Sequence, residues 1–259
     1  MSIKGNENHI LVGLGGTGGK VLKAFRKRLF QEYSSEERAK LSIGYVYVDS
    51  TREMMQPNDI TFRVLGQDAS FGESEFVYVR GVELNSVFAN PSGFPGLKGF
   101  IGDPEVMQKT IGSVETAAGQ KRRAGRILFG SSVQNYLSTL RSQYIKAKGI
   151  SGKNTLNIHI FTGLAGGTGS GSIIDVLAQT RCEYPDAHIV LYAMIPEPTV
   201  PMGCDAGRYQ ANGYAALVEL NALMAKKYMP YDVTGKYERV PLENVKAVVD
   251  NCILPQIRN

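Results

Sequence analysis

Residues 163–172 read GLAGGTGSGS, with five glycines in ten positions, and they follow the apolar stretch LNIHIFT at 156–162. Each glycine in a folded segment costs about 0.5–1 kcal/mol relative to alanine. Where a strand turns into a helix, unpaired N–H groups and the helix dipole attract phosphate, and glycines remove side chains that would block it. The run is therefore shaped as a cradle for an anion, with hydroxyl donors at Thr168 and Ser170. A tight turn that binds nothing is the simpler alternative.

Apolar runs alternate with amphipathic stretches along the rest of the chain. Strands are predicted at 9–14, 43–50, 76–81, 156–162, 188–196 and 247–257, and helices at 20–33, 125–148, 172–184 and 208–228. This alternation predicts an α/β fold, a Rossmann-like, doubly wound and mostly parallel sheet with helices on both faces. The Gly- and Pro-rich segment 90–104 is predicted to be a surface loop, with no functional interpretation.

Composition narrows the class of protein. The 259 residues are 43% hydrophobic, which suits a globular domain with a substantial core. The sequence has neither a membrane span nor a signal peptide, so a cytoplasmic protein is predicted. Three separated cysteines, Cys182, Cys204 and Cys252, indicate neither a disulfide framework nor a zinc site. A net charge of +5 allows an acidic partner, without a strong signal for nucleic acid.

A second glycine turn lies near the start of the chain, in GLGGTGGK at 13–20. It contains GxGxxG at Gly13, Gly15 and Gly18, and Asp49 ends the next predicted strand. This pattern is typical of dinucleotide binding, although the gap to Asp49 exceeds the usual ~20 residues. Two glycine cradles on two strands suggest that one phosphate chain is held from both sides.

The segment GLAGGTGSGSIID resembles the tubulin motif GGGTGSG, which FtsZ carries in a variant form. Three other segments agree with tubulin in chain order: VDST at 48–51, AAGQKRRAGR at 117–126, and EYPD at 183–186 with HIVLYAMIPEP after it. The chain is therefore identified as a member of the tubulin/FtsZ superfamily, similar to its divergent bacterial representatives.

The resemblance implies a site for GTP or GDP, with magnesium possible. The α- and β-phosphates would be held by Gly13, Leu14, Gly15, Gly16, Thr17, Gly18, Gly166, Gly167, Thr168, Gly169 and Ser170. The terminal phosphate would contact Ala118, Gly119 and Gln120. Asp49 would bind the magnesium or its water shell, Arg208 would lie near the ribose, and Asn259 would contact the guanine. Leu14, Gly18 and Lys20 stand where tubulin has glutamines and FtsZ an asparagine, and Thr51 replaces a second acidic residue, so some polar contacts are lost or replaced.

The resemblance also implies head-to-tail self-assembly into filaments. It covers the nucleotide-binding half of such proteins, so residues 1–259 are expected to form one domain that lacks the central helix and the C-terminal domain. The acidic residues that position the attacking water in this superfamily come from a loop beyond the central helix. The chain is therefore expected to bind nucleotide and hardly hydrolyse it, with no catalytic residue of its own.

Two other functions are considered. An NAD(P)-dependent oxidoreductase would use the first glycine turn and Asp49, but it leaves GGTGSG without a role, and His9, His159 and His188 are expected to be structural. A tubulin-like scaffold without nucleotide would retain the entropic cost of its glycines for no gain. One basic cluster, Lys121/Arg122/Arg123/Arg126, either faces phosphate or a subunit interface or is a solvated helix start. The other, Lys20/Lys23/Arg26/Lys27/Arg28, either contacts an acidic partner or is the solvated outer face of the first helix.

Overall fold

The computed structural model describes residues 7–79, 84–111, 120–200, 202–203 and 206–255 of the chain. Its strands are β1 (Asn8–Leu14), β2 (Ile43–Asp49), β3 (Arg63–Val64), β4 (Gln67–Asp68), β5 (Phe76–Tyr78), β6 (Leu156–Gly163), β7 (His188–Met194) and β8 (Asn251–Ile253). Its helices are α1 (Gly15–Glu32), α2 (Ser35–Arg38), α3 (Leu84–Ala89), α4 (Pro95–Ile101), α5 (Pro104–Ile111), α6 (Arg122–Ser131), α7 (Val133–Ser151), α8 (Thr168–Glu183) and α9 (Tyr209–Met224).

In this described part of the chain, the main sheet has six strands in the order β5-β2-β1-β6-β7-β8. All of its pairings are parallel, while β3 and β4 form a separate antiparallel pair. The predicted α/β fold is therefore confirmed. At the carboxyl edge, Leu14 of β1 lies opposite Val48 of β2 and Thr162 of β6, so the turns after these three strands begin side by side.

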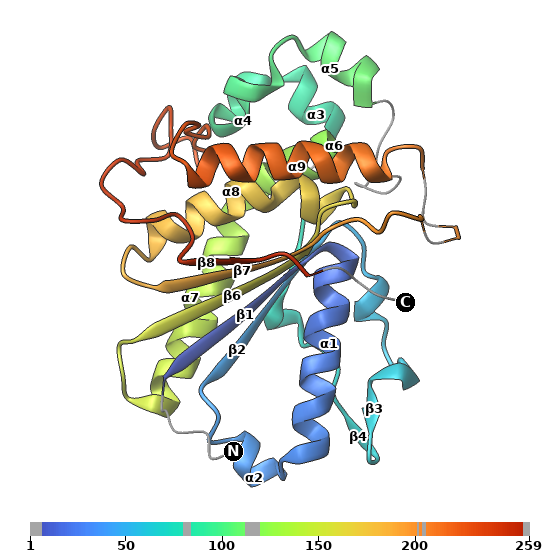
Figure 1. Ribbon diagram of the computed structural model, residues 1–259, viewed down its shortest axis with the longest axis vertical. Helices are drawn as coiled ribbons and strands as arrows, with labels where there is room; N and C mark the ends of the chain where they lie inside the picture. The colour runs from blue at the N-terminus through green and yellow to red at the C-terminus, as the bar shows by residue number, and fades with distance from the viewer. Residues whose placement is uncertain (1–6, 80–83, 112–119, 201, 204–205, 256–259) are drawn as a thin grey trace.

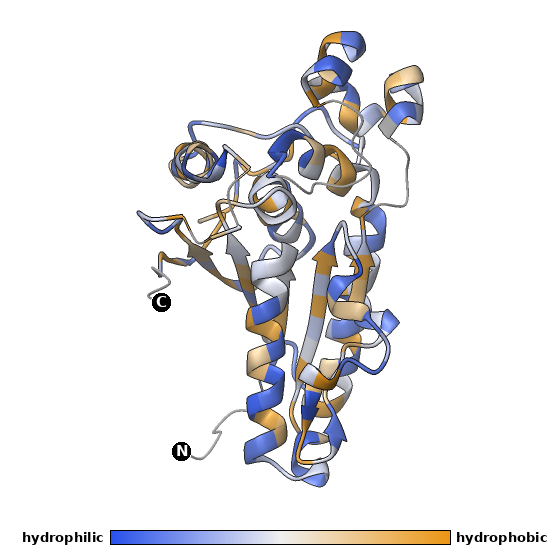
Figure 2. Ribbon diagram, turned by 90° about the vertical axis from the view of Figure 1, so that its right-hand side faces the viewer, coloured by the Kyte–Doolittle hydropathy of each residue, from blue (hydrophilic) through white to orange (hydrophobic). Residues whose placement is uncertain are grey.

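Helices cover both faces of the sheet (Figure 1). On one face α1 packs against β1, β2 and β6, where Leu22 is buried with Tyr47, Phe62 and other aromatic rings. On the other face lie α7 and α8, with α6 and α9 packed on α8 in the larger core cluster. Figure 2 shows the strands as mostly apolar and α1 as a mixture of hydrophilic and hydrophobic residues, as expected for a helix with one solvated side.

The predicted long helix at 125–148 is wrong, because two helices occupy this stretch. The first, α6, ends at Ser131, and α7 begins at Val133. Ser132 between them has φ −116° and ψ 10°, and its N–H bonds to the Phe129 carbonyl at 2.9 Å. The apolar periodicity runs through the break because both helices bury residues in the same core cluster.

The prediction of a surface loop at 90–104 is also wrong. A 3-10 turn at Pro91–Gly93 is followed by α4 and the start of α5, and Leu97 and Ile101 are buried. Pro95 occupies the first turn of α4, where its missing N–H costs nothing. A Cβ on Gly96 would collide with the carbonyl of Val233, so this glycine serves close packing of a helix.

The two outer strands are shorter than predicted. In the described residues, β5 ends at Tyr78, and β8 pairs with β7 only over Asn251–Ile253. Cys182 and Cys252 are free thiols, while Cys204 lies outside the described residues. Among the described helices, none combines the length and the apolar character that a membrane span requires.

The three histidines lie in or at the start of strands, as predicted. Nδ1 of His9 and Nε2 of His159 are 3.2 Å apart, and their rings stack at a centroid distance of 5.5 Å. Burial, followed by the nearby His9 and His188, lowers the pKa of His159 to about 4. The hydrogen bond between the two rings needs one neutral nitrogen as acceptor, which agrees with this direction.

This lowered pKa predicts a loss of stability in mild acid. The unfolded chain takes up a proton near pH 6.5 and the folded chain only near pH 4, so stability is fully present above pH 6.5 and falls as the pH drops toward 4. His159→Phe should reduce this dependence, measured by urea unfolding at pH 7.5 and pH 5.5. The same comparison between pH 7.5 and 9 is the control. An identical acid dependence in variant and wild type would contradict the assignment.

Candidate functional site

The first glycine turn takes the chain from β1 directly into α1. Leu14 is extended, with φ −107° and ψ 122°, and Gly15 has φ +64°, a conformation that favours glycine. The helix starts at Gly15, five residues earlier than predicted. No side chain caps it, and its first turn contains no acidic residue. Its first N–H groups therefore have neither a capping oxygen nor a negative charge from that turn.

The second glycine turn repeats this arrangement after β6. The N–H of Leu164 bonds to the carbonyl of Met194 at 3.0 Å, and α8 begins at Thr168 with Gly167 as its N-cap residue. Here too no side chain caps the helix, and no acidic residue lies in the first turn. Two helix N-termini without a capping side chain or an acidic residue in the first turn thus leave the same edge of the sheet.

The two turns are in direct contact. A Cβ on Gly15 would lie 3.0 Å from the nitrogen of Gly169, and a Cβ on Gly169 would lie 2.7 Å from the carbonyl oxygen of Leu14. Gly163 abuts the side chain of Thr17 in the same way. The glycines at these positions let the N-termini of α1 and α8 lie side by side.

Gly16 and Gly166 differ from Gly15, Gly18 and Gly169. Both are exposed, and a Cβ on either would meet no described atom within 4 Å. Neither has the positive φ of Gly15. By contrast, a Cβ on Gly18 would collide with the carbonyl of Phe161. Packing and backbone conformation therefore explain Gly15 and Gly18, while each turn leaves open space over one glycine, Gly16 in the first turn and Gly166 in the second.

Asp49, at the end of β2, connects the turn after β2 to the second glycine turn, which follows β6. Its carboxylate accepts hydrogen bonds from the Tyr47 hydroxyl at 2.7 Å, the Ser50 N–H at 2.7 Å and the Thr168 hydroxyl at 3.2 Å. The hydroxyls of Ser50 and Thr168 are 2.9 Å apart. Asp49 is only 5% exposed, and this burial raises its pKa. It therefore holds the start of α8 against β2.

This network bears on the predicted magnesium site. Both oxygens of Asp49 already accept hydrogen bonds from protein groups. No group of three or more His, Cys, Asp or Glu side chains among the described residues is arranged to hold a metal ion. The described residues thus offer no all-protein cage, and a magnesium ion at this edge would have to be held mainly by phosphate oxygens and water, with Asp49 behind them.

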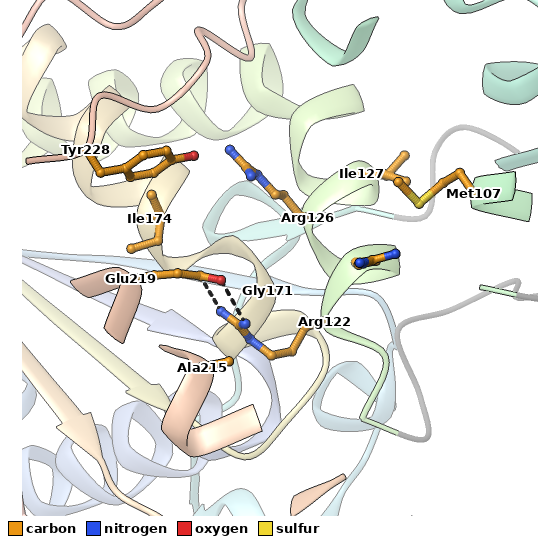
Figure 3. A pocket seen from close by; sticks show the side chains of 10 residues that line it. Met107, Arg122, Arg126, Ile127, Gly171, Ile174, Ala215, Glu219 and Tyr228 are labelled. Atoms are coloured by element: carbon orange, nitrogen blue, oxygen red, sulfur yellow. Dashed lines mark hydrogen bonds and ion pairs between the residues drawn. The ribbon is translucent and has the colours of Figure 1, made fainter. Parts of the chain in front are cut away.

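Several predicted site residues use their side chains within the fold. Leu14 and Ser170 are fully buried, and the Ser170 hydroxyl accepts from Nε of Arg122 at 2.8 Å. Arg122 also pairs with Glu219 of α9 at 2.6 Å, as Figure 3 shows. Leu14 and Ser170 can therefore offer only backbone groups to a ligand, and Arg122 faces α8 and α9. It borders a cavity of about 630 Å³ between α6, α8 and α9.

The neighbouring arginine also serves packing. Arg126 makes two hydrogen bonds to Asp175, of 2.8 and 2.9 Å. Burial alone would lower the pKa of Arg126, but the attraction of Asp175 raises it. The backbones of α6 and α8 are also in contact. Gly125 of α6 abuts the carbonyl of Gly167, and Gly171 of α8 abuts the carbonyl of Arg122.

Gln120 and Arg208 lie together at the start of α9. Oε1 of Gln120 accepts from the N–H groups of Ala206 and Arg208, both at 3.3 Å. Both residues line a cavity of about 290 Å³ with Lys121, Arg122 and Arg123. The other predicted contacts, Ala118, Gly119 and Asn259, lie outside the described residues.

Sequence reasoning missed Asn212 of α9, which connects Gln120 to the second glycine turn. The residue is 8% exposed, and its Nδ2 donates to the carbonyls of Gln120 at 2.8 Å and Ala165 at 2.9 Å. A signal was present: Asn212 shares the buried side of α9 with Ala216 and Leu220, at helical spacing. A polar residue on an apolar helix face indicates a specific buried partner.

The comparisons with known proteins bear on the family and on the fold. A model of the family described as "Tubulin like" matches residues 10–259. The chain belongs to this tubulin-like family. No curated protein matches the sequence.

Among solved structures, the tubulin-like chain resembles CetZ from Methanosaeta thermophila, with 14% sequence identity and a TM-score of 0.52. The match covers 83% of this chain and 42% of CetZ, so the chain spans less than half the length of that protein. At this identity the likeness supports the fold.

The Arg126–Asp175 pair gives a test of how α6 is held on α8. The Asp175 side chain has 0% exposure, so Arg126→Ala leaves a buried carboxylate without its counter-charge. We expect a loss of about 3–5 kcal/mol in the free energy of unfolding, measured with urea. Replacing both residues, Arg126→Met with Asp175→Leu, should recover most of it.

The control is Arg141→Ala, which removes the more exposed pair with Glu183. Its cost should stay at or below about 1 kcal/mol. If Arg126→Ala lowered the free energy of unfolding as little as Arg141→Ala, the buried pair would not be needed to hold α6 on α8.

Proposed function

We propose that this tubulin-like chain binds a guanine nucleotide, GTP or GDP, with its phosphates over the two glycine turns. The supporting observation is the open space at Gly16 and Gly166, beside two adjoining helix N-termini that lack capping side chains and acidic residues in their first turns. Such termini favour an anion, and the glycines let it approach the backbone. The preference for guanine rests on the resemblance to tubulin and FtsZ.

The chain's groups divide into two sets in this proposal. Backbone groups of Gly13–Gly18 and Gly166–Ser170 bind the α- and β-phosphates. Residues Ala118–Gln120 bind the terminal phosphate. Arg208 lies near the ribose, and Asn259 is the candidate for the base. A magnesium ion, when bound, supplies charge neutralisation on the phosphates, with Asp49 near its water shell. In this proposal Tyr47 and Ser50 hold the turns through Asp49 and Thr168, and Arg122 holds the start of α8 through Ser170.

The experiment is thermal unfolding with GTP, GDP, ATP or NAD, each with and without magnesium. A ligand at ~100 times its Kd should stabilise the fold by about 2.7 kcal/mol, and we expect this shift with GTP and GDP only. Gly16→Val and Gly166→Val should keep ligand-free stability within about 1 kcal/mol, because open space surrounds both positions. Both should weaken nucleotide binding at least ~10-fold by obstructing the phosphates.

Two control substitutions separate binding from folding. Gly149→Val, in α7, also meets open space and should change neither property. Gly18→Ala should destabilise the ligand-free fold by about 1–3 kcal/mol through its collision with Phe161. Full nucleotide shifts in Gly16→Val and Gly166→Val would contradict the proposed site. A shift with NAD alone would replace it with the dinucleotide function, and no shift at all would leave the nucleotide-free scaffold.

We further propose head-to-tail self-assembly in the manner of tubulin and FtsZ, with hydrolysis completed by a neighbouring subunit. The resemblance supports this proposal, and an isolated chain then has only electrostatic stabilisation of the phosphates. In a single-turnover assay, dilute chain should bind GTP and hydrolyse it far more slowly than an assembled filament. Hydrolysis at a filament-like rate, independent of protein concentration, would overturn this part.

A further inference from the structure

The side chain of Asn212 lies at the meeting point of three segments. From the buried side of α9, Nδ2 donates to the carbonyls of Gln120 at 2.8 Å and Ala165 at 2.9 Å, with a longer contact to Gly166 at 3.4 Å. Carbonyl oxygens only accept, so the amide can face them only with its NH₂ group. This fixes the orientation of the side chain.

Gln120 is also hydrogen-bonded to the residues at the start of α9. Its own carbonyl accepts from Asn212, while its side-chain oxygen accepts from the N–H groups of Ala206 and Arg208. Gln120 has φ +61°, an uncommon conformation for a residue with a side chain. Contacts on both sides of Gln120 therefore hold a turn that the backbone alone would not favour.

Asn212 thus lies behind the open position of the second glycine turn. Ala165 and Gly166 are the residues just before the N-cap of α8, and Gly166 is one of the two glycines with open space over it. Gln120 ends the segment whose earlier residues are proposed to contact the terminal phosphate. One amide group, with two hydrogen atoms, serves carbonyls from both segments.

We propose that Asn212 is a positioning residue of the nucleotide site: it sets the position of Gln120 relative to the glycine turn at Ala165–Gly166. It acts through the two backbones, because its amide group already donates to the carbonyls of Gln120 and Ala165. The inference rests on the proposed nucleotide function for its consequence, but the coupling of the two segments belongs to the chain without ligand.

The decisive variant is Asn212→Asp. It keeps the shape of the side chain but turns the donor into an oxygen that faces three carbonyl oxygens. Asn212→Ala removes the donor without adding repulsion. Asn221→Asp is the matched control, because Asn221 is an exposed residue of the same helix.

The first measurement is amide hydrogen exchange of the ligand-free chain. Useful probes are the bonded N–H groups of Gly125, next to the Gln120 segment, and Leu164 and Gly171, on either side of the second glycine turn. In Asn212→Asp we expect all three to exchange at least ~10-fold faster, with amides in the middle of β1 and α7 unchanged. Asn212→Ala should show the same pattern more weakly, and Asn221→Asp the wild-type pattern.

The second measurement is the Kd for GDP, well below the unfolding temperature of each variant. We expect it to rise at least ~10-fold in Asn212→Asp and to stay unchanged in Asn221→Asp. A purely structural role would instead lower the unfolding temperature and speed exchange everywhere. Wild-type exchange at all three probes in both Asn212 variants would overturn the inference, as would a wild-type Kd in Asn212→Asp.

The two proposals can fail separately. If the wild-type chain binds no nucleotide, the proposed function fails, while the exchange pattern still tests the coupling. If both Asn212 variants fail to fold, exchange of the wild-type chain in low urea decides instead. Gly125, Leu164 and Gly171 should then open together with the Asn212 amide, and unrelated opening of these probes would reject the coupling.

Discussion

The candidate site depends on direct contact between two backbones, at Gly15 and Gly169. A Cβ on Gly15 would approach the nitrogen of Gly169 to 3.0 Å, so larger residues would push the two helix starts apart. Only with this contact do the positive ends of α1 and α8 add at one place. Parallel strands supply the approach, because β1 and β6 are neighbours and end level with each other. The close packing of the glycines and the proposed anion binding at this edge thus have one cause.

The sequence was sufficient for the architecture, and it marked the two glycine turns that the structure brings together at one edge of the sheet. Strands buried on both faces are apolar runs, helices with one solvated face are periodic, and glycine turns mark where the two meet. It was insufficient where a local pattern has two solutions. Periodicity continues through Ser132 although the helix breaks there, and the glycines of 90–104, counted as loop formers, serve the packing of α4 against Val233.

Side-chain roles within the site were the hardest to predict, because they depend on partners far away in sequence. The position of Asp49 followed from the end of its strand, but its engagement with Thr168 needs β2 and β6 on either side of β1. The Ser170 hydroxyl was expected to face a phosphate, but it accepts a hydrogen bond from Arg122 of α6. Asn212 belongs to no local motif, and only the packing of α9 brings it to the glycine turn.

The glycine contact between α6 and α8 has a mechanical consequence. Side chains between packed helices can absorb small displacements by rotating about their torsions, whereas two touching backbones have no such compliance. Gly125 abuts the carbonyl of Gly167 with nothing between them, so α6 must follow a shift of the second glycine turn almost rigidly. At Ser132 the helix axis is interrupted, and α7 beyond it is packed on β1 and β2. A displacement of α6 is therefore not carried into α7 along one continuous helix.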